Sequence, residues 1–274
     1  FTIIFSSEVW GFSNNEVLEK IHLKFCKLLL NLKSSTPNYM VYGELGRHPV
    51  DIDIKIRAVL FWANLISGKQ AKFSCILYQL SRHMNVHFNM QTKWILFVKK
   101  IFQDCGFSYI WKTQNFINKD WLKTVIKQRL LDQFLQNWNS LIQNSSKAIN
   151  YKIFKKNWEF EEYFNILNFK DAVVLCRFRT TNNKLPIETG RWQNVLRENR
   201  VCHLCKNRQI GDEYHYILEC TFFDQKRTEY LSSYFVQRHN TFKFSELMSS
   251  TRKPVLKKLC LFIKNINTCV CPPG

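Results

Sequence analysis

Four residues in the last third of the chain constrain its fold more than any other feature. Cys202, Cys205, His215 and Cys220 follow the spacing C-x2-C-x9-H-x4-C. Three thiolates and one imidazole are the donor set of a closed, four-coordinate structural zinc site. Because protein side chains would fill every coordination position, none remains for a catalytic water. The pattern predicts one structural Zn2+ that stabilises a small module.

Other interpretations of these residues exist. The chain has 274 residues with ten cysteines and seven histidines, so four unrelated side chains are the main alternative. A His-x4-Cys pair so close to a Cys-x2-Cys pair favours zinc over that alternative. His203 is a competing ligand, although it lies between two cysteines that already converge. Five positions separate His215 from Cys220, which is a loose spacing for one straight helical face.

A second cysteine pair, Cys269 and Cys271, stands at the end of the chain. No further ligands follow it, and a spacing of one residue is unusual for zinc. The sequence therefore predicts one metal site and no second one.

The sequence around the predicted metal site is similar to a known family. Residues 177–192 read R-F-R-T-T-N-N-K-L-P-I-E-T-G-R-W, residues 202–205 read C-H-L-C and residues 212–220 read D-E-Y-H-Y-I-L-E-C. This order resembles the C-terminal zinc-binding region of non-LTR (LINE-type, jockey-like) retrotransposon reverse transcriptases. Residues 7–12 and 36–47 resemble the stretch that follows the polymerase palm in such elements. The resemblance covers about residues 1–235 and is strongest over 177–220.

One departure from the family bears on activity. The family's polymerase holds two metal ions with adjacent aspartates, and two-metal phosphoryl transfer requires converging carboxylates. This chain contains no Asp-Asp pair and begins at Phe1. It resembles a C-terminal piece of a larger polyprotein whose polymerase lies outside it. We therefore expect no enzymatic activity from the chain itself, whereas the parent polyprotein is expected to be an RNA-directed DNA polymerase.

No other class of enzyme is indicated. The sequence has no Gly-rich phosphate loop and no nucleophile motif. Glu161 and Glu162 are neighbours on a predicted helix, so their side chains diverge by roughly 100°. The pair Asp212 and Glu213 is predicted to cap the helix that follows it, because acidic groups suit a helix N-terminus.

The charge balance indicates a polyanionic partner. Forty Lys and Arg stand against 21 Asp and Glu, which gives a net charge of +19. Nucleic acid is the first candidate, either RNA or DNA, and an anionic membrane surface is the second. No apolar run approaches the ~20 residues that span a bilayer, so no membrane insertion is expected. The cysteines show no disulfide framework, which favours an intracellular location in the cytoplasm or nucleus.

The candidate phosphate-binding residues form two groups. The first lies before and within the predicted zinc loop and comprises Arg177, Arg179, Lys184, Arg191, Arg197, Arg200, Lys206 and Arg208. Arg binds phosphate through two N–H groups, and aromatic rings stack on unpaired bases. Trp192 and Tyr214 are interleaved with these cations, but we expect them to be core residues. A solvated face is the alternative interpretation of the whole group.

The second basic group comprises Lys20, Lys24 and Lys27. By the resemblance, it would belong to a polymerase thumb, which contacts phosphates along the template–primer duplex.

Helical spacing dominates the chain, and low Gly and Pro contents of eight and six agree with a mainly α fold. Helices are predicted through 18–32, 51–67, 73–84, 92–104, 119–142 and 169–178. In the first helix, one apolar face comprises Leu18, Ile21, Phe25, Leu28, Leu29 and Leu32. In the second, the predicted inward residues are Ile52, Ile56, Val59, Leu60 and Ala63.

We expect four parts along the chain. Residues 1–142 are predicted to form a thumb-like helical bundle, and the polar stretch 143–150 a linker. Residues 151–235 are predicted to form a small Cys3His zinc-binding domain, followed by a basic C-terminal segment over 236–274.

The resemblance and the charge together predict a non-catalytic fragment of a retrotransposon reverse transcriptase. Its partners would be element RNA or target DNA and the rest of the polyprotein. The alternative is a degenerate or domesticated zinc module that mediates protein–protein interaction.

Overall fold

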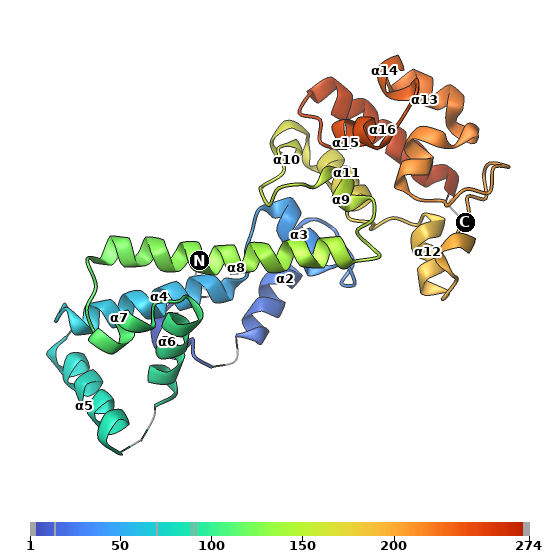
Figure 1. Ribbon diagram of the computed structural model, residues 1–274. Coiled ribbons are helices and arrows are strands. Elements are labelled where there is room, and N and C mark those ends of the chain that lie inside the picture. The colour runs from blue at the N-terminus through green and yellow to red at the C-terminus, as the bar shows by residue number, and fades with distance from the viewer. Residues whose placement is uncertain (1–3, 14, 70, 89, 91, 271–274) are drawn as a thin grey trace. The chain divides into compact units, whose positions relative to one another are not determined.

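The computed structural model describes residues 4–13, 15–69, 71–88, 90 and 92–270 (Figure 1). Within these residues the fold is helical and contains no strand, which confirms the predicted mainly α class. Two isolated antiparallel bridges occur, Leu45 with Phe160 and Val201 with Ile210. The chain divides into two compact units. Unit 1 comprises 1–23 and 48–137, and unit 2 comprises 24–47 and 138–274.

These units do not follow the predicted boundaries. Residues 24–47 belong to unit 2, although the sequence placed them in a bundle over 1–142. The predicted linker 143–150 also lies inside unit 2, where Ala148 and Asn150 are buried. The polar stretch marks the loop after one long helix. A polar stretch in the sequence indicates where a helix ends. It does not indicate which distant segments pack around the loop that follows.

Unit 1 is built from helices in sequence order. They are α1 (Ser7–Trp10), the first part of α2 (Glu16–Leu29), α4 (Val50–Ile66), α5 (Lys72–Phe88), α6 (Lys93–Asp104), α7 (Ser108–Thr113) and most of α8 (Lys119–Asn144). At the centre of its core lies Trp62 of α4, which is fully buried and donates its indole N–H to the Tyr78 hydroxyl at 2.9 Å. The inward face predicted for α4 is confirmed at Ile52, Ile56 and Val59.

Most of the apolar face predicted for residues 18–32 is exposed, although Leu32 is buried and Leu18 packs against a small core cluster. Phe25 and Leu28 are 63% and 69% exposed, whereas Leu23, Cys26 and Leu30 are buried. The buried set also repeats at three- and four-residue intervals, so α2 offers two apolar faces. Spacing alone does not choose between two such faces, because the choice depends on what packs against the helix.

Unit 2 contains the remaining helices and the last turns of α2 and α8. The helices before the predicted zinc loop are α3 (Asn38–Leu45), α9 (Tyr151–Phe154), α10 (Tyr163–Ile166), α11 (Phe169–Arg179), α12 (Pro186–Trp192) and the 3-10 turn η2 (Arg197–Asn199). Those after it are η3 (His215–Glu219), η4 (Thr221–Phe223), α13 (Asp224–Tyr230), α14 (Ser233–Val236), α15 (Thr241–Met248) and α16 (Lys253–Val270).

The predicted basic C-terminal segment is largely a core helix. On one face of α16, Leu256, Leu259, Phe262 and Ile263 are all fully buried. This face packs on α11 and α13, so α16 is part of unit 2 and not an appendage. The lysines of the segment occupy the opposite, solvated face. Cys271 of the second cysteine pair lies outside the described residues.

A buried ion-pair network organises unit 2 around Arg179, at the end of α11. Its Nε lies 3.0 Å from Glu44 Oε2, and its Nη2 lies 3.1 Å from Glu44 Oε1. The same Nη2 lies 2.9 Å from Glu161 Oε2, and Nη1 donates to the Met248 carbonyl at 2.5 Å. Arg179 was predicted to contact nucleic acid, but it is 1% exposed. Sequence spacing did not reveal this burial.

Further partners complete the network. The Lys155 ammonium lies 2.5 Å from Glu161 Oε1, and the Tyr163 hydroxyl donates to Glu44 Oε2 at 2.5 Å. Two carboxylates therefore face two cations, and every charge has a partner. This balance matters because a buried charge without a partner is strongly destabilising. The network joins α3, α11, α15 and the segment around α10, which lie far apart in the sequence.

We predict that Arg179→Met strongly destabilises unit 2. The variant leaves Glu44 buried without its main counter-charge, which costs about 3 to 5 kcal/mol of unfolding free energy. Arg177→Gln is the matched control on the same helix, where a partly exposed side chain is worth at most about 0.5 kcal/mol. Urea denaturation followed by circular dichroism measures both. Equal midpoints for the two variants would contradict the structural role of Arg179.

Candidate metal centre

A short hairpin carries the first two cysteines. The Cys202 N–H donates to the Gln209 carbonyl at 2.8 Å, and the Gly211 N–H donates to the Arg200 carbonyl at 2.9 Å. Between these bonds the chain turns back on itself, and the Leu204 N–H points at Cys202 Sγ from 3.4 Å. The turn directs the sulfurs of Cys202 and Cys205 toward the same space.

A close backbone contact anchors this hairpin to α12. The Ile187 N–H donates to the Gly211 carbonyl at 3.1 Å. A Cβ atom at Gly211 would lie 2.8 Å from Pro186 Cγ, which is too close for any side chain. Glycine is required here because the hairpin lies directly against the first turn of α12.

A π-turn carries the other two candidate ligands. The Asp212 carboxylate accepts the His215 N–H at 3.0 Å and caps the helix start, as predicted for this residue. From His215 to Glu219 the helix widens, and the Cys220 N–H donates to the His215 carbonyl at 2.8 Å. In an α-helix, five residues would leave the two side chains about 140° apart. The wider turn returns Cys220 to the side of His215, which explains the loose spacing.

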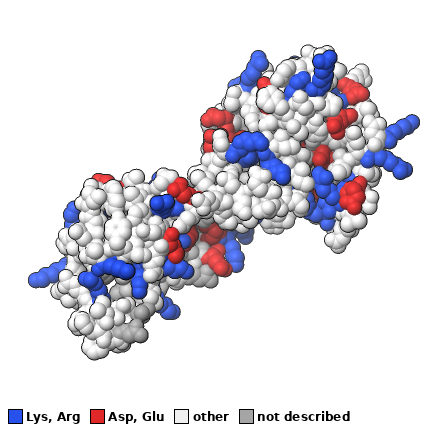
Figure 2. Space-filling view, in the orientation of Figure 1, with Lys and Arg blue, Asp and Glu red and all other residues white. Residues whose placement is uncertain are grey.

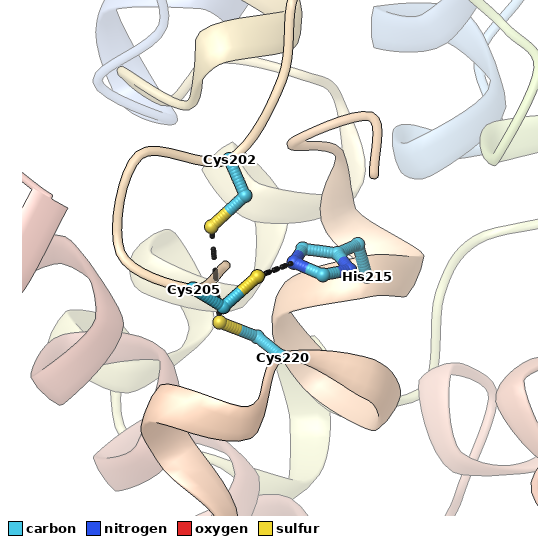
Figure 3. Close-up of side chains that lie close together, drawn as sticks. All are labelled: Cys202, Cys205, His215 and Cys220. Atoms are coloured by element: carbon cyan, nitrogen blue, oxygen red, sulfur yellow. Dashed lines mark hydrogen bonds between the residues drawn. The ribbon is translucent and has the colours of Figure 1, made fainter. Parts of the chain in front are cut away.

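The four side chains converge as the sequence predicts (Figure 3). All four ligand atoms lie within 4.8 Å of one another, with Cys202, His215 and Cys220 buried and Cys205 half-buried. The Cys202 and Cys220 sulfurs are 3.8 Å apart, and Cys205 Sγ lies 3.5 Å from His215 Nε2. The competing candidate His203 is exposed and is not a member of the cluster. The cluster can hold one metal ion.

The imidazole is oriented by a neighbouring amide. His215 Nδ1 lies 2.9 Å from Gln209 Oε1, and an amide oxygen only accepts hydrogen bonds. Nδ1 therefore carries the proton, and the Nε2 lone pair faces the three sulfurs. Such a partner on the far nitrogen is typical of metal-bound histidine.

Two of the cysteine side chains interact with each other at this site. The hydrogen bond between Cys202 and Cys220 lowers the pKa of Cys202 and raises the pKa of Cys220. Burial raises the pKa of Tyr216, whose side chain hydrogen-bonds Cys202. A bound cation would hold the cysteines as thiolates, because the thiolate is the ligand.

Two further residues support this site, Arg227, which the sequence did not single out, and Glu213, which it assigned to a helix cap. Arg227 is buried and donates to the Ile217 carbonyl at 2.8 Å and to the Cys220 carbonyl at 2.7 Å. These carbonyls lie at the end of the π-turn, and the Cys220 carbonyl also accepts the Phe223 N–H at 3.0 Å. Glu213 is buried between the amides of Asn150 and Asn183, and burial raises its pKa to about 7. Glu213 therefore anchors the turn and does not cap it.

The structure separates the predicted phosphate-binding residues into two classes. Besides Arg179, four of these residues form hydrogen bonds or ion pairs within the protein. Arg200 donates to the Val195 carbonyl at 2.9 Å, and Lys27 donates to the Ser34 carbonyl at 2.8 Å. Arg191 Nε lies 3.3 Å from Glu188 Oε1, and Arg197 lies 3.8 Å from Asp212. Arg197 and Arg200 thereby hold the segment just before Cys202, whereas Lys27 secures the loop after α2.

The other predicted cations point away from internal partners. Within the described part of the chain, no hydrogen bond or ion pair involves the side chains of Arg177, Lys184, Lys206, Arg208, Lys20 or Lys24. All are exposed except Arg177, which is half-buried. Figure 2 shows Lys and Arg in separate groups over the face drawn, with fewer Asp and Glu between them.

Tyr214 and Trp192, the two aromatic residues interleaved with these cations, differ in burial. Tyr214 is half-buried and packs edge-on against Phe244 at 5.3 Å, in line with the predicted core position. Trp192 was also expected in the core, but it is 52% exposed. Trp192 is the last residue of α12, and the Lys33 ammonium lies 4.0 Å from the centroid of its ring.

Comparisons of the chain with protein-family models, curated proteins and solved structures found no match. In the described part of the chain, no helix has both the length and the apolar character of a membrane span.

We predict that Gln209→Ala weakens metal binding about 10- to 100-fold without removing a ligand, because the imidazole loses the acceptor that orients it. Gln193→Ala, at an exposed position on the preceding loop, is the control. Competition with a chromogenic chelator measures both affinities. Equal affinities in the two variants would show that Gln209 does not orient His215.

Proposed function

We propose that the cluster binds Zn2+ and that unit 2 is a zinc-stabilised nucleic-acid-binding module. A tetrahedral site with Zn–S bonds of about 2.3 Å and a Zn–N bond of about 2.0 Å places two sulfurs about 3.8 Å apart, and a sulfur and nitrogen about 3.5 Å apart. The Cys202–Cys220 and Cys205–His215 distances of 3.8 Å and 3.5 Å have these values. Four protein donors favour a structural role for the ion.

The observation that carries the nucleic-acid proposal is the set of unpaired cations in unit 2. The hairpin that carries Cys202 and Cys205 presents Lys206 and Arg208 to solvent, and Arg177 and Lys184 lie upstream of it. Cations with no internal partner add nothing to the stability of the fold, yet the whole chain carries a net charge of +19. A polyanion with regularly spaced phosphates neutralises such a surface and releases its own counterions.

The resemblance to non-LTR reverse transcriptases supports a more specific role. In that family the corresponding region follows the polymerase, and we propose that it holds element RNA or target DNA during target-primed reverse transcription. The thumb-like role of the first helices, with Lys20 and Lys24 facing phosphates, belongs to the same proposal. So does an intracellular site of action in the cytoplasm or nucleus.

We propose a binding role and no catalysis for this chain. Glu44 and Glu161 both contact Arg179, but Arg179 and Lys155 neutralise them. A two-metal centre needs carboxylates that are free to bind metal. The cluster of four protein ligands likewise leaves no coordination position for substrate.

Zinc removal should unfold the module locally. We expect one zinc per chain in protein purified under reducing conditions and a much lower zinc content in Cys205→Ser, because a structural site that loses one of its four protein ligands binds the ion more weakly. In that variant, hydrogen exchange should rise over residues 195–225 and remain unchanged in unit 1. Cys75→Ser, in unit 1, is the control and should keep its zinc. Elemental analysis that finds no zinc in the parent protein would disprove the assignment.

The second test addresses nucleic-acid binding. We expect the parent chain to bind single-stranded RNA and DNA with an affinity that falls steeply with salt. Lys206→Gln with Arg208→Gln should bind more weakly, and the slope of log K against log salt should fall by about 0.7 for each phosphate that the variant no longer neutralises.

Lys253→Gln with Lys257→Gln is the control, since it removes the same charge from the start of α16. Filter binding across a salt series measures all three proteins. Binding that does not depend on salt in the parent would favour the protein-interaction alternative. Equal weakening in both double variants would show that only net charge matters.

A further inference from the structure

A cavity of about 220 Å3 opens in unit 2 between α11 and the loop that leads to α12. Arg177 and Lys184 line it from two sides, together with the carboxamides of Asn182, Asn183 and Asn267. No carboxylate is among its lining residues. Asn182 and Asn183 donate their amides to Thr36 and Glu213, so the groups that the cavity offers are chiefly the two positive charges, which suit a small anionic group.

The two cations of this cavity are not held by the protein. Within the described residues, neither the Arg177 guanidinium nor the Lys184 ammonium makes a hydrogen bond or ion pair. Arg179, two positions away, is by contrast fully paired. Two unpaired cations at one cavity repel each other, and an anion between them would relieve this repulsion.

A third cation and an aromatic ring belong to the same unit as the cavity. The Lys33 ammonium stands 4.0 Å from the centroid of the Trp192 ring, and 52% of Trp192 is exposed. Burial lowers the pKa of Lys33, the charges of Arg177 and Lys184 lower it further, and the charge of Glu188 raises it. The loop that lines the cavity leads directly into α12, whose seven residues end at Trp192. A helix of that length spans only about 10 Å, so the ring lies a short distance from the cavity loop along the chain.

This combination fits an unpaired nucleotide. The cations suit a phosphate, and an exposed indole provides a stacking surface for any base. In a duplex the bases already stack on each other, and their faces are not available to a side chain. An exposed tryptophan beside a phosphate site is thus more useful for a single strand than for a duplex.

We propose that one phosphate of a single-stranded RNA or DNA binds between Arg177 and Lys184, and that an adjacent base stacks on Trp192. Lys33 holds the next phosphate on the same path. This site rests on the proposed nucleic-acid function and adds to it the strand type and the contact residues. It is separate from the exposed Lys206 and Arg208 of the hairpin that carries Cys202 and Cys205.

The experiment uses fluorescein-labelled dT12, its duplex with dA12, and inorganic polyphosphate as competitor. For dT12, Arg177→Gln with Lys184→Gln should lower the salt slope by about 1.4 relative to the parent. Trp192→Leu should lower affinity at least about fivefold, whereas Trp192→Phe should recover most of that affinity, because stacking on an aromatic ring contributes that much per base. The Lys253→Gln, Lys257→Gln protein is the charge-matched control. Zinc content and circular dichroism confirm that each variant is folded.

The outcomes separate the two proposals. A parent that binds dT12 without salt dependence overturns the proposed function. If the parent binds with salt dependence but the Arg177, Lys184 variant matches the charge control, this site is wrong and the proposed function stands. If Trp192→Leu binds as the parent does, or if polyphosphate and duplex compete as well as dT12, stacking is excluded. Selective weakening of dT12 binding in both site variants supports the proposal.

Discussion

The fold of unit 2 depends on one guanidinium group. Arg179 satisfies two carboxylates and a backbone carbonyl, and it does so from a position without access to solvent. The Phe154 ring lies 4.5 Å from its central carbon, so even the face of the group is covered. Such a network is costly to desolvate, and its geometric demands are strict. Segments 24–47 and 138–274 pack as one unit only if Glu44 reaches this position.

The metal centre is formed in a related way, by two short pieces of chain that have little structure of their own. The hairpin contributes two cysteines, and the π-turn contributes a histidine and a cysteine. Each piece is fastened to its surroundings by backbone contacts: Gly211 lies against Pro186, and Arg227 holds the last carbonyls. The rest of unit 2 therefore prepares the site, and a metal ion would join two pieces that already face each other.

The sequence predicted features that depend on local chemistry. The ligand set followed from donor type and spacing, and the long helices followed from apolar periodicity. It failed where a residue's role depends on distant segments. Arg177 and Arg179 look alike in the sequence, yet one faces a cavity and the other is enclosed by residues up to 135 positions away. For the same reason, the predicted linker 143–150 lies inside unit 2, and most of the apolar face predicted for α2 is exposed.

The π-turn has a consequence for how this site tolerates changes in length. A π-turn contains one residue more than the α-turn it replaces, and His215 and Cys220 face the metal position only because of this extra residue. Deletion of one residue between them would restore ordinary helical winding and give a four-residue separation, which again places both side chains on one face. Insertion of one residue has no such remedy. The segment can therefore be shortened by a residue and keep its ligands, but it cannot be lengthened.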